Sequence, residues 1–416
     1  MILTAIPLAE QQTSALLLLV SAALVLLMTP GVAFFYGGLV RVKSVVSMMM
    51  FSFGAMAVVG VLWVLFGYAM AFGEPLIPGW LGDPLSAIGL TSLLGIQADG
   101  TMAPDLAGLA FAGFQGAFAI LAVALVSGSI ADRAKFSSWL IFAGLFAIIV
   151  YFPVAFWVFN LDNGWGPALG VNDFAGGTAI HINAGAAGLA LALVLGRRIG
   201  FSKGSHRPHN VPLTLLGAAI LWFGWFGFNA GSAAVVDGTA ALALVNTIAA
   251  PAAGIIGWLI FEQLRNGKPT AVGAASGAIA GLVAVTPGCN ILTPVWSIVL
   301  GVLAGALCAW AIDWKFRLGY DDSLDVVGIH LVGGMLGTLW IGLVGQGIGL
   351  LDTGSLDQLG IQALAAFGVL AYSFVASLLL GLLVRRFFGF RIASEAEEAG
   401  IDEASHGERG YAFTES

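Results

Sequence analysis

Long apolar stretches, separated by short polar segments, recur along the whole chain. A helix needs about 20 predominantly apolar residues to cross the ~30 Å hydrocarbon core of a bilayer. In lipid, a helix satisfies its backbone hydrogen bonds within a single segment. The pattern therefore predicts an all-α polytopic membrane protein with eleven transmembrane helices, at residues 14–37, 44–73, 105–129, 136–160, 174–196, 211–234, 239–262, 270–287, 294–313, 323–346 and 361–389.

The composition of the chain agrees with this pattern. Of its 416 residues, 59% are hydrophobic and 9% are charged, whereas a soluble globular chain carries about 25% charged residues. The net charge is −7, and no basic patch extends beyond the loops on one side of the predicted membrane. We therefore expect membrane lipid around this chain and no nucleic acid as a partner.

The lysines and arginines predict the orientation of the chain. All 16 of them fall on one side of the eleven-span map, at Arg41, Lys43, Arg133, Lys135, Arg197, Arg198, Lys203, Arg207, Arg265, Lys268, Lys315, Arg317, Arg385, Arg386, Arg391 and Arg409. The loops on the other side carry acids alone. Under the positive-inside rule, this predicts an external N-terminus and a cytoplasmic C-terminus in the cell (inner) membrane.

Two histidines lie within the apolar spans, each a few residues after an aspartate. His181 ends the string D-F-A-G-G-T-A-I-H, which begins at Asp173, and His330 ends D-V-V-G-I-H, which begins at Asp325. An ionisable side chain at membrane depth is costly, so a functional site is its default interpretation. The remaining histidines lie in polar segments, at His206, His209 and His406.

The two aspartate–histidine pairs also indicate an internal repeat. Asp173 lies at the outer end of the fifth span and Asp325 at the inner end of the tenth. Two inverted-topology repeats followed by an eleventh helix would explain this arrangement, and both imidazoles would then approach the middle of the bilayer. The predicted parts are repeats at about 14–196 and 211–346, an eleventh helix at about 361–389, a transmembrane domain at 1–392 and a cytoplasmic tail at 393–416.

Several local strings are specific enough to indicate a family. They are D-F-A-G-G-T-A-I-H-I-N-A-G (173–185), G-W-F-G-F-N-A-G-S (224–232), F-Q-G-A-F-A (114–119), A-D-R-A-K-F-S (131–137) and D-D-S-L-D-V-V-G-I-H (321–330). With the order of the spans, they resemble the Amt/Mep/Rh ammonium transporter family over essentially the whole chain. The tail string G-I-D-E-A-S-H-G-E-R-G-Y (400–411) is similar to the tails of bacterial Amt proteins.

The resemblance implies a homotrimer with one ammonium pore in each protomer. His181 and His330 match a twin-histidine pair that lines the pore, and Phe118 and Phe228 match a stacked gate above it. Phe114, Phe118 and Ser232 match an external site that recruits ammonium. The resemblance also implies a PII-type regulatory protein as a partner at the cytoplasmic face, and no cofactor.

One position departs from the usual pattern of the family. The register set by Tyr151 and Pro153 puts Phe159 where many bacterial members carry a tryptophan of the recruitment site. Phenylalanine attracts a cation less strongly than tryptophan does. Because of this register we include Phe159 in the recruitment site. Because its attraction is weaker, we expect a lower affinity for the external cation.

Three residues are expected to support the site. Asp173 could attract cations or cap the fifth span, and its position directly before F-A-G-G favours capping. Asp325 is expected to play the matching role in the tenth span. Trp225, within the string at 224–232, is assigned a supporting role as well.

Two facing imidazoles suit the chemistry that separates ammonium from potassium. The two ions have the same charge and nearly the same size, but ammonium donates directional hydrogen bonds and can lose a proton. A neutral imidazole donates with one nitrogen, accepts with the other and titrates near neutrality. We expect a channel or transporter that conducts ammonia, with a relayed proton, through a hydrophobic pore at His181 and His330.

Other interpretations stay open at this point. The histidines could simply bind a neighbouring helix, or they could ligate a b-type haem between the fifth and tenth spans. The same fold could also serve mainly as an ammonium sensor (transceptor), although no output domain follows the eleventh span. An enzyme is not expected, because no nucleophile–base set, metal-ligand cluster or phosphate-binding loop is evident in the sequence.

Overall fold

The computed structural model of the chain describes residues 8–201 and 207–412, so Lys203 and His206 lie outside the described residues. Within the described part, eleven helical spans are long and apolar enough to cross a membrane, which confirms the prediction. The largest boundary difference is five residues, at the end of the ninth span (313 predicted, Leu318 observed). The spans are Gln12–Leu39, Val42–Phe72, Leu106–Ile130, Phe136–Phe159, Gly177–Leu195, Val211–Gly231, Gly238–Asn266, Ala271–Gly288, Pro294–Leu318, Val327–Val344 and Asp357–Phe388.

Four spans, the first, sixth, seventh and eleventh, consist of one long helix, and the other seven combine two or more helical elements. Their elements are α1 (Leu8–Leu39), α2 (Val45–Leu62), η3 (Trp63–Gly67), α3 (Tyr68–Phe72), α4 (Leu106–Val126), η5 (Ser127–Ile130), α5 (Phe136–Phe146), η6 (Ala147–Tyr151), α6 (Phe152–Phe159), η7 (Gly177–Ile182), α8 (Asn183–Leu195), α9 (Val211–Gly231), α10 (Gly238–Asn266), α11 (Ala271–Val285), η9 (Thr286–Gly288), α12 (Pro294–Ala311), α13 (Trp314–Leu318), η10 (Val327–Leu331), α14 (Val332–Val344) and α16 (Asp357–Phe388). The second span begins with η2 (Val42–Ser44). The connections and the tail contain the antiparallel pair β1 (Pro75–Ile77) and β2 (Leu81–Gly82), η4 (Ile88–Leu93), α7 (Trp165–Leu169), α15 (Leu350–Thr353), α17 (Ser394–Ala399) and α18 (Ile401–His406).

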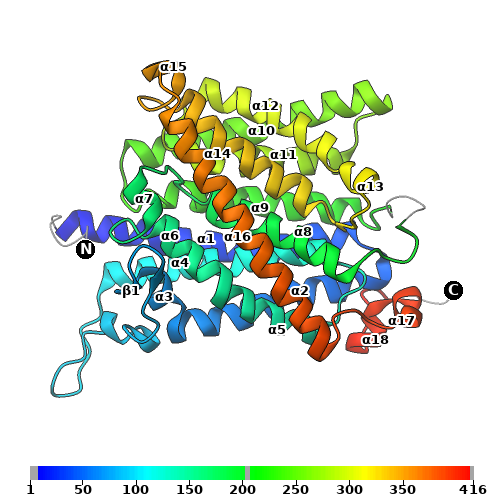
Figure 1. Cartoon of the computed structure of the whole chain (residues 1–416), viewed down its shortest axis with the longest axis horizontal. Helices are drawn as coiled ribbons and strands as arrows, with labels where there is room; N and C mark the ends of the chain where they lie inside the picture. Colours follow the sequence, from blue (N-terminus) through cyan, green and yellow to red (C-terminus); the bar gives the residue numbers. More distant parts are fainter. Residues whose placement is uncertain (1–7, 202–206, 413–416) are drawn as a thin grey trace.

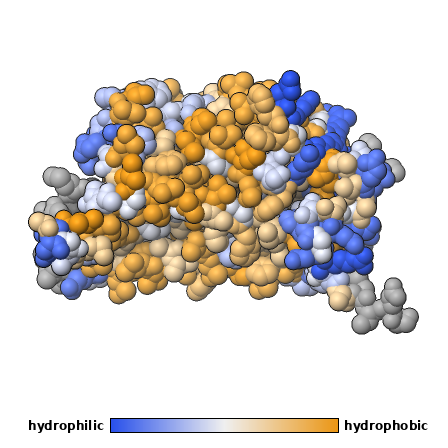
Figure 2. Space-filling model, turned by 90° about the horizontal axis from the view of Figure 1, so that it is seen from below, coloured by the Kyte–Doolittle hydropathy of each residue, from blue (hydrophilic) through white to orange (hydrophobic). Residues whose placement is uncertain are grey.

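The surface of the molecule carries a broad apolar band with hydrophilic side chains at both ends (Figure 2). On α16 alone, the exposed large apolar side chains include Leu364, Phe367, Val375 and Leu379. Apolar surface of this extent is rare on a soluble monomer and marks contact with lipid or protein. The chain is therefore a multi-pass membrane protein whose outer helices face lipid.

The third, fifth and eighth spans form the centre of the molecule. Between 83% and 89% of their most apolar windows is buried, compared with 33% for the eleventh span. That span, α16, crosses the outer face as a long tilted helix (Figure 1) and packs on α8 and α14. Small residues allow close packing elsewhere: a Cβ on Gly217 of α9 would lie 2.1 Å from the backbone nitrogen of Phe35 of α1.

The fifth and tenth spans both begin with a π-helical turn. These turns, η7 and η10, come from spans that run in opposite directions, and they contact each other. η7 contains His181 and η10 contains His330. The inverted pair agrees with the predicted 5+5 repeat, and π turns within helices are frequent at functional sites.

The two ends of the molecule differ in charge. We call the end with all described lysines and arginines the basic end, and the opposite one the acidic end. Ion pairs join the loops of the basic end: Arg41 with Asp132 at 3.7 Å, Arg198 with Asp132 at 3.2 Å, and Arg198 with Asp321 at 2.9 Å. These loops therefore form one connected surface.

The C-terminal tail is folded against the basic end. Asp402 of α18 is buried and accepts hydrogen bonds from the backbone nitrogens of Val46 (3.1 Å) and Ser47 (2.8 Å) at the start of α2. Glu397 of α17 is also buried and accepts a hydrogen bond from the Ile199 backbone (2.7 Å). The tail thus satisfies backbone donors at the ends of two different spans.

Candidate functional site

His181 and His330 meet in the interior of the molecule. Their Nδ1 atoms lie 3.2 Å apart, within hydrogen-bonding distance, and their rings are nearly parallel at 15°. Both side chains are buried, with 0% and 4% of their surface exposed. His181 Nε2 has no hydrogen-bond partner within residues 8–201 and 207–412. The pair therefore forms one unit that still has ring nitrogens available beyond their mutual bond.

A file of aromatic rings leads from the acidic end towards this pair. Phe114 and Phe118 are one helical turn apart on α4, with ring centroids 4.7 Å apart. Phe118 stacks on Phe228 of α9 at 4.2 Å and 19°. Phe228 in turn lies 6.1 Å from the ring of His181, at 23°. Phe118 and Phe228 are almost completely buried, and Phe228 lies between the ring of Phe118 and that of His181.

The residues expected at the recruitment site lie around the outer part of this file. Phe159, at the end of α6, is partly exposed, and its ring is 6.4 Å from that of Phe118 in an edge-on arrangement. Ser232 follows α9 and is also partly exposed. Its hydroxyl donates a hydrogen bond to the Phe228 carbonyl (2.8 Å), so its lone pairs remain able to accept one.

Asp173 holds the start of η7 in place. Its carboxylate accepts hydrogen bonds from the backbone nitrogens of Gly176 (3.0 Å), Thr178 (2.8 Å) and Ala179 (3.2 Å), and also from that of Gly177 and from the Thr178 hydroxyl. The first N–H groups of a helix have no partner within the helix, and a carboxylate is a favourable acceptor for them. Asp173 thus fixes the turn that carries His181.

The matching role in the tenth span, expected of Asp325, falls to Asp322 instead. Asp322 Oδ2 accepts the hydrogen bond of the Val327 backbone at the start of η10 (2.7 Å). Asp325 adopts a positive φ of 65° and binds Lys315 of α13, which turns its carboxylate away from the helix. Sequence reasoning missed Asp322, although it precedes His330 by eight residues, as Asp173 precedes His181.

Trp225 packs against the inner part of the site. Its ring lies 5.4 Å from that of His181, at 20°, and 5.3 Å from that of Phe228. Its indole nitrogen donates a hydrogen bond to the Thr286 hydroxyl in η9 (2.9 Å). This bond fixes the plane of the indole and therefore limits the rotation of the His181 ring beside it.

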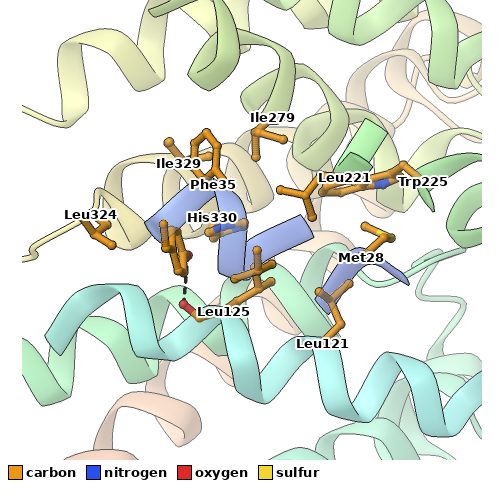
Figure 3. Close-up of a pocket in the computed structure, with 12 residues that line it drawn as sticks. Met28, Phe35, Leu121, Leu125, Leu221, Trp225, Ile279, Leu324, Ile329 and His330 are labelled. Atoms are coloured by element: carbon orange, nitrogen blue, oxygen red, sulfur yellow. Dashed lines mark hydrogen bonds between the residues drawn. The ribbon is translucent and has the colours of Figure 1, made fainter. Parts of the chain in front are cut away.

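A narrow apolar cavity adjoins His330 (Figure 3). Its volume is about 10 Å³, which is close to the smallest space that holds one water molecule. Figure 3 shows His330 directed into this space among the apolar side chains. The lining consists of Met28, Val32, Phe35, Tyr36, Leu121, Leu125, Leu221, Trp225, Ile279, Leu324, Ile329 and His330.

Arg133 connects this region to the basic end, and the sequence analysis assigned it no role beyond its charge. It is completely buried and donates hydrogen bonds to the carbonyls of Asp321 (2.6 Å) and Ser129 (3.2 Å) and to the Ser323 hydroxyl. Burial lowers its pKa to about 10. These bonds tie the end of the third span to the loop that precedes η10.

The histidine pair does not fit a haem. The two axial nitrogens of a bis-histidine haem lie on opposite sides of the iron, about 4 Å apart, whereas the two Nδ1 atoms are 3.2 Å apart. The adjoining cavity is also far too small for a porphyrin. Among the described residues, no group of three or more His, Cys, Asp and Glu could hold a metal ion.

Comparisons with known proteins agree with this arrangement. The model of the Ammonium Transporter Family matches residues 16–411. The ammonium transporter of Mycobacterium tuberculosis is 50% identical over 95% of this chain and 89% of its own length. That of Bacillus subtilis is 43% identical over 94% of this chain and 96% of its own.

Solved structures show the same fold. Mep2 of Candida albicans superposes with a TM-score of 0.86 at 30% identity, over 99% of this chain and 96% of that one. A protein described as a Sensor Amt Protein superposes with a TM-score of 0.87 at 30% identity, over 96% and 99% of the two chains. Together with the eleven spans, these matches define a membrane transporter rather than an enzyme. The chain belongs to the ammonium transporter family.

Proposed function

We propose that this protein recruits ammonium at the acidic end and conducts ammonia, with a relayed proton, through a pore at His181 and His330. The observation that carries the proposal is the hydrogen-bonded imidazole pair, 3.2 Å apart, at the inner end of the aromatic file. Ammonium first meets the recruitment site of Phe114, Phe118, Phe159 and Ser232. There, aromatic faces attract the cation by ~0.5–2 kcal/mol.

Selectivity follows from the apolar path beyond this site. Ammonium and potassium are similar in charge and size, and an apolar conduit opposes both as bare ions. Only ammonium can leave its proton behind and continue as a small neutral molecule. The gate of Phe118 and Phe228 and the cavity near His330 would therefore pass ammonia and stop potassium.

The histidine pair offers a defined route for the released proton. In the neutral pair, one Nδ1 carries the hydrogen of the shared bond, so the two rings hold opposite tautomers. If His181 donates that hydrogen, its Nε2 accepts a proton from ammonium, the Nδ1 hydrogen passes to His330, and the Nε2 hydrogen of His330 leaves. Each ring keeps one hydrogen, so no net charge remains on the pair. Both tautomers must be restored before the next transfer.

The setting of this pore is part of the proposal. The separation of charges between the basic and acidic ends supports the cell (inner) membrane, with the N-terminus outside and the C-terminus in the cytoplasm. The docked tail offers a folded surface at that face, which supports a PII-type regulatory protein as a partner. As in the family resemblance, we propose a homotrimer with one pore in each protomer.

A sensor is the second candidate function. The likeness to the Sensor Amt Protein, over nearly the whole of both chains, favours it. A sensor would bind ammonium at the same recruitment site and would need little flux through the pore. Flux measured on the purified protein separates the two candidates.

A stopped-flow assay tests the proposal. The protein is reconstituted into liposomes that contain a pH-sensitive dye, and an ammonium gradient is applied. We expect His181→Ala and His330→Ala to slow the internal pH change at least about tenfold, because proton relays contribute factors of this order or more. His209→Ala is the matched control, since His209 lies outside the spans and binds the Val40 carbonyl (2.9 Å). Wild-type rates in both pore variants would refute the role of the pair.

A further inference from the structure

A second pocket lies outside the pore, at the basic end of the lipid-facing helix α16. It has a volume of about 410 Å³, within the range of about 300–1,000 Å³ that is typical of small-molecule sites. It lies between the ends of two spans, the fifth and the eleventh. Its lining consists of Leu193, Val194, Leu195, Gly196, Arg385, Gly389, Phe390 and Arg391.

Cations surround this pocket. Arg385 Nη1 donates a hydrogen bond to the Val194 carbonyl (3.0 Å), and no acid pairs with Arg385 within the described residues. Lys135 lies beside the pocket. Its Nζ would be 3.2 Å from a Cβ placed on Gly389, which is one of the lining residues. Arg391 is the exception, since Glu397 accepts its Nη2 hydrogen bond at 2.7 Å. Two positive charges, those of Lys135 and Arg385, are thus left without a counter-ion.

The rim of the pocket is apolar and continues into the lipid-facing band. Leu193 in the lining is 51% exposed, and Phe388, next to the lining residue Gly389, is 53% exposed. An occupant therefore meets positive charge on one side and hydrocarbon on the other. A free anion would use only the first of these surfaces.

We infer that this pocket binds the phosphodiester head group of an anionic phospholipid from the leaflet at the basic end. The head group would lie between Lys135 and Arg385, and its acyl chains would run along Leu193 and Phe388, which is three residues from Arg385 on the same side of α16. Basic pockets between transmembrane helices are suited to such head groups. Arg391, in the lining of the pocket, leads into the docked tail, so a bound lipid would also cover the place where the tail leaves the membrane.

Native mass spectrometry of the full chain in detergent tests the inference. Phosphatidylglycerol, phosphatidylcholine and glycerophosphoglycerol, the head group without acyl chains, are added in separate titrations. We expect the first phosphatidylglycerol to bind more tightly than phosphatidylcholine. Lys135→Gln and Arg385→Gln should each weaken it about fivefold, and Arg385→Lys should restore it. Lys268→Gln, which removes an exposed cation beyond α10, is the matched control and should bind as the wild type does.

Three outcomes would overturn the inference. Equal binding of the two lipids would exclude recognition of the anionic head group. Wild-type affinity in both Gln variants would place the lipid elsewhere, or show that another copy of the chain covers the pocket. Displacement of the lipid by glycerophosphoglycerol at equal concentration would identify a site for free anions. Lys135→Gln removes no hydrogen bond seen in the structure, so a folding defect of Arg385→Gln would still leave the test decisive.

Discussion

His181 and His330 bind each other through the same ring atom, Nδ1, although their helices run in opposite directions. This symmetry has a chemical consequence, because a shared hydrogen between like atoms can belong to either ring. The remaining nitrogens then differ: the Nε2 of one ring accepts and that of the other donates. The pair therefore has a polarity that reverses whenever a proton passes through it.

The two aspartates that precede these histidines should respond differently to the same substitution. Both carboxylate oxygens of Asp173 accept hydrogen bonds, whereas Asp322 uses Oδ2 alone and its Oδ1 has no partner in the described part of the chain. Asp173→Asn puts an amide against N–H donors and should lower the free energy of unfolding by about 1–3 kcal/mol. Asp322→Asn keeps the acceptor and removes a buried negative charge, so it should raise the free energy of unfolding at pH 7, by about 3 kcal/mol. Thermal melting in detergent measures both, and an equal loss of stability would contradict the assignment.

Asp322 should also make stability depend on pH. Burial raises the pKa of its carboxyl from 3.8 to about 6. The folded state thus holds this proton more tightly than the unfolded state, so the stabilisation is complete below pH 4 and is lost as the pH rises to about 6. Over this window, the wild type should lose about 3 kcal/mol relative to Asp322→Asn. The measurement is the difference between their melting curves at several pH values, and parallel pH profiles would refute it.

Phe159 should limit the affinity of the recruitment site. Its ring faces the edge of Phe118 near the acidic end, and tryptophan attracts cations more strongly than phenylalanine does. Phe159→Trp should therefore lower the half-saturating ammonium concentration for uptake about two- to fivefold. Phe367→Trp is the control, because Phe367 is exposed on the lipid-facing side of α16. If neither binding nor uptake changes in Phe159→Trp, this residue lies outside the site.

The tail should stabilise the second span through Asp402. This residue caps α2 by accepting two backbone hydrogen bonds, and loss of such a cap costs about 0.5–2 kcal/mol. Asp402→Ala should reduce the free energy of unfolding by this amount. Glu403→Ala is the neighbouring control, since Glu403 pairs with Arg409 on the exposed surface, where ion pairs contribute little. An equal change in the free energy of unfolding for Asp402→Ala and Glu403→Ala would show that the Asp402 cap does not stabilise α2.

The membrane spans could be predicted because each one carries its own signal. Apolar composition over about 20 residues marks a span without reference to any other part of the chain, and the charges then fix the number of crossings. The largest error, at Leu318, arose because the basic residues Lys315 and Arg317 continue the helix as α13. The charged residues therefore end the apolar pattern at residue 313, whereas the helical backbone continues to Leu318.

Much of the site depends on contacts that a single sequence does not show. The π turns η7 and η10 result from backbone hydrogen bonds, and apolar periodicity contains no signal for them. Phe118 and Phe228 stack across two helices, and with 28 phenylalanines in the chain their spacing alone does not select them. A signal for Asp322 was present in its distance of eight residues from His330. Asp325 also lies at the inner end of the tenth span, and the sequence alone does not show which of the two carboxylates meets the helix start.

Solid-supported membrane electrophysiology on proteoliposomes tests the central claim most directly. Ammonium and potassium pulses are compared for the wild type, His181→Ala and His330→Ala at equal protein density. The account predicts an ammonium current and no potassium current for the wild type, and an ammonium current that falls at least about tenfold in each variant. Variants that keep both the ammonium current and the exclusion of potassium would contradict it.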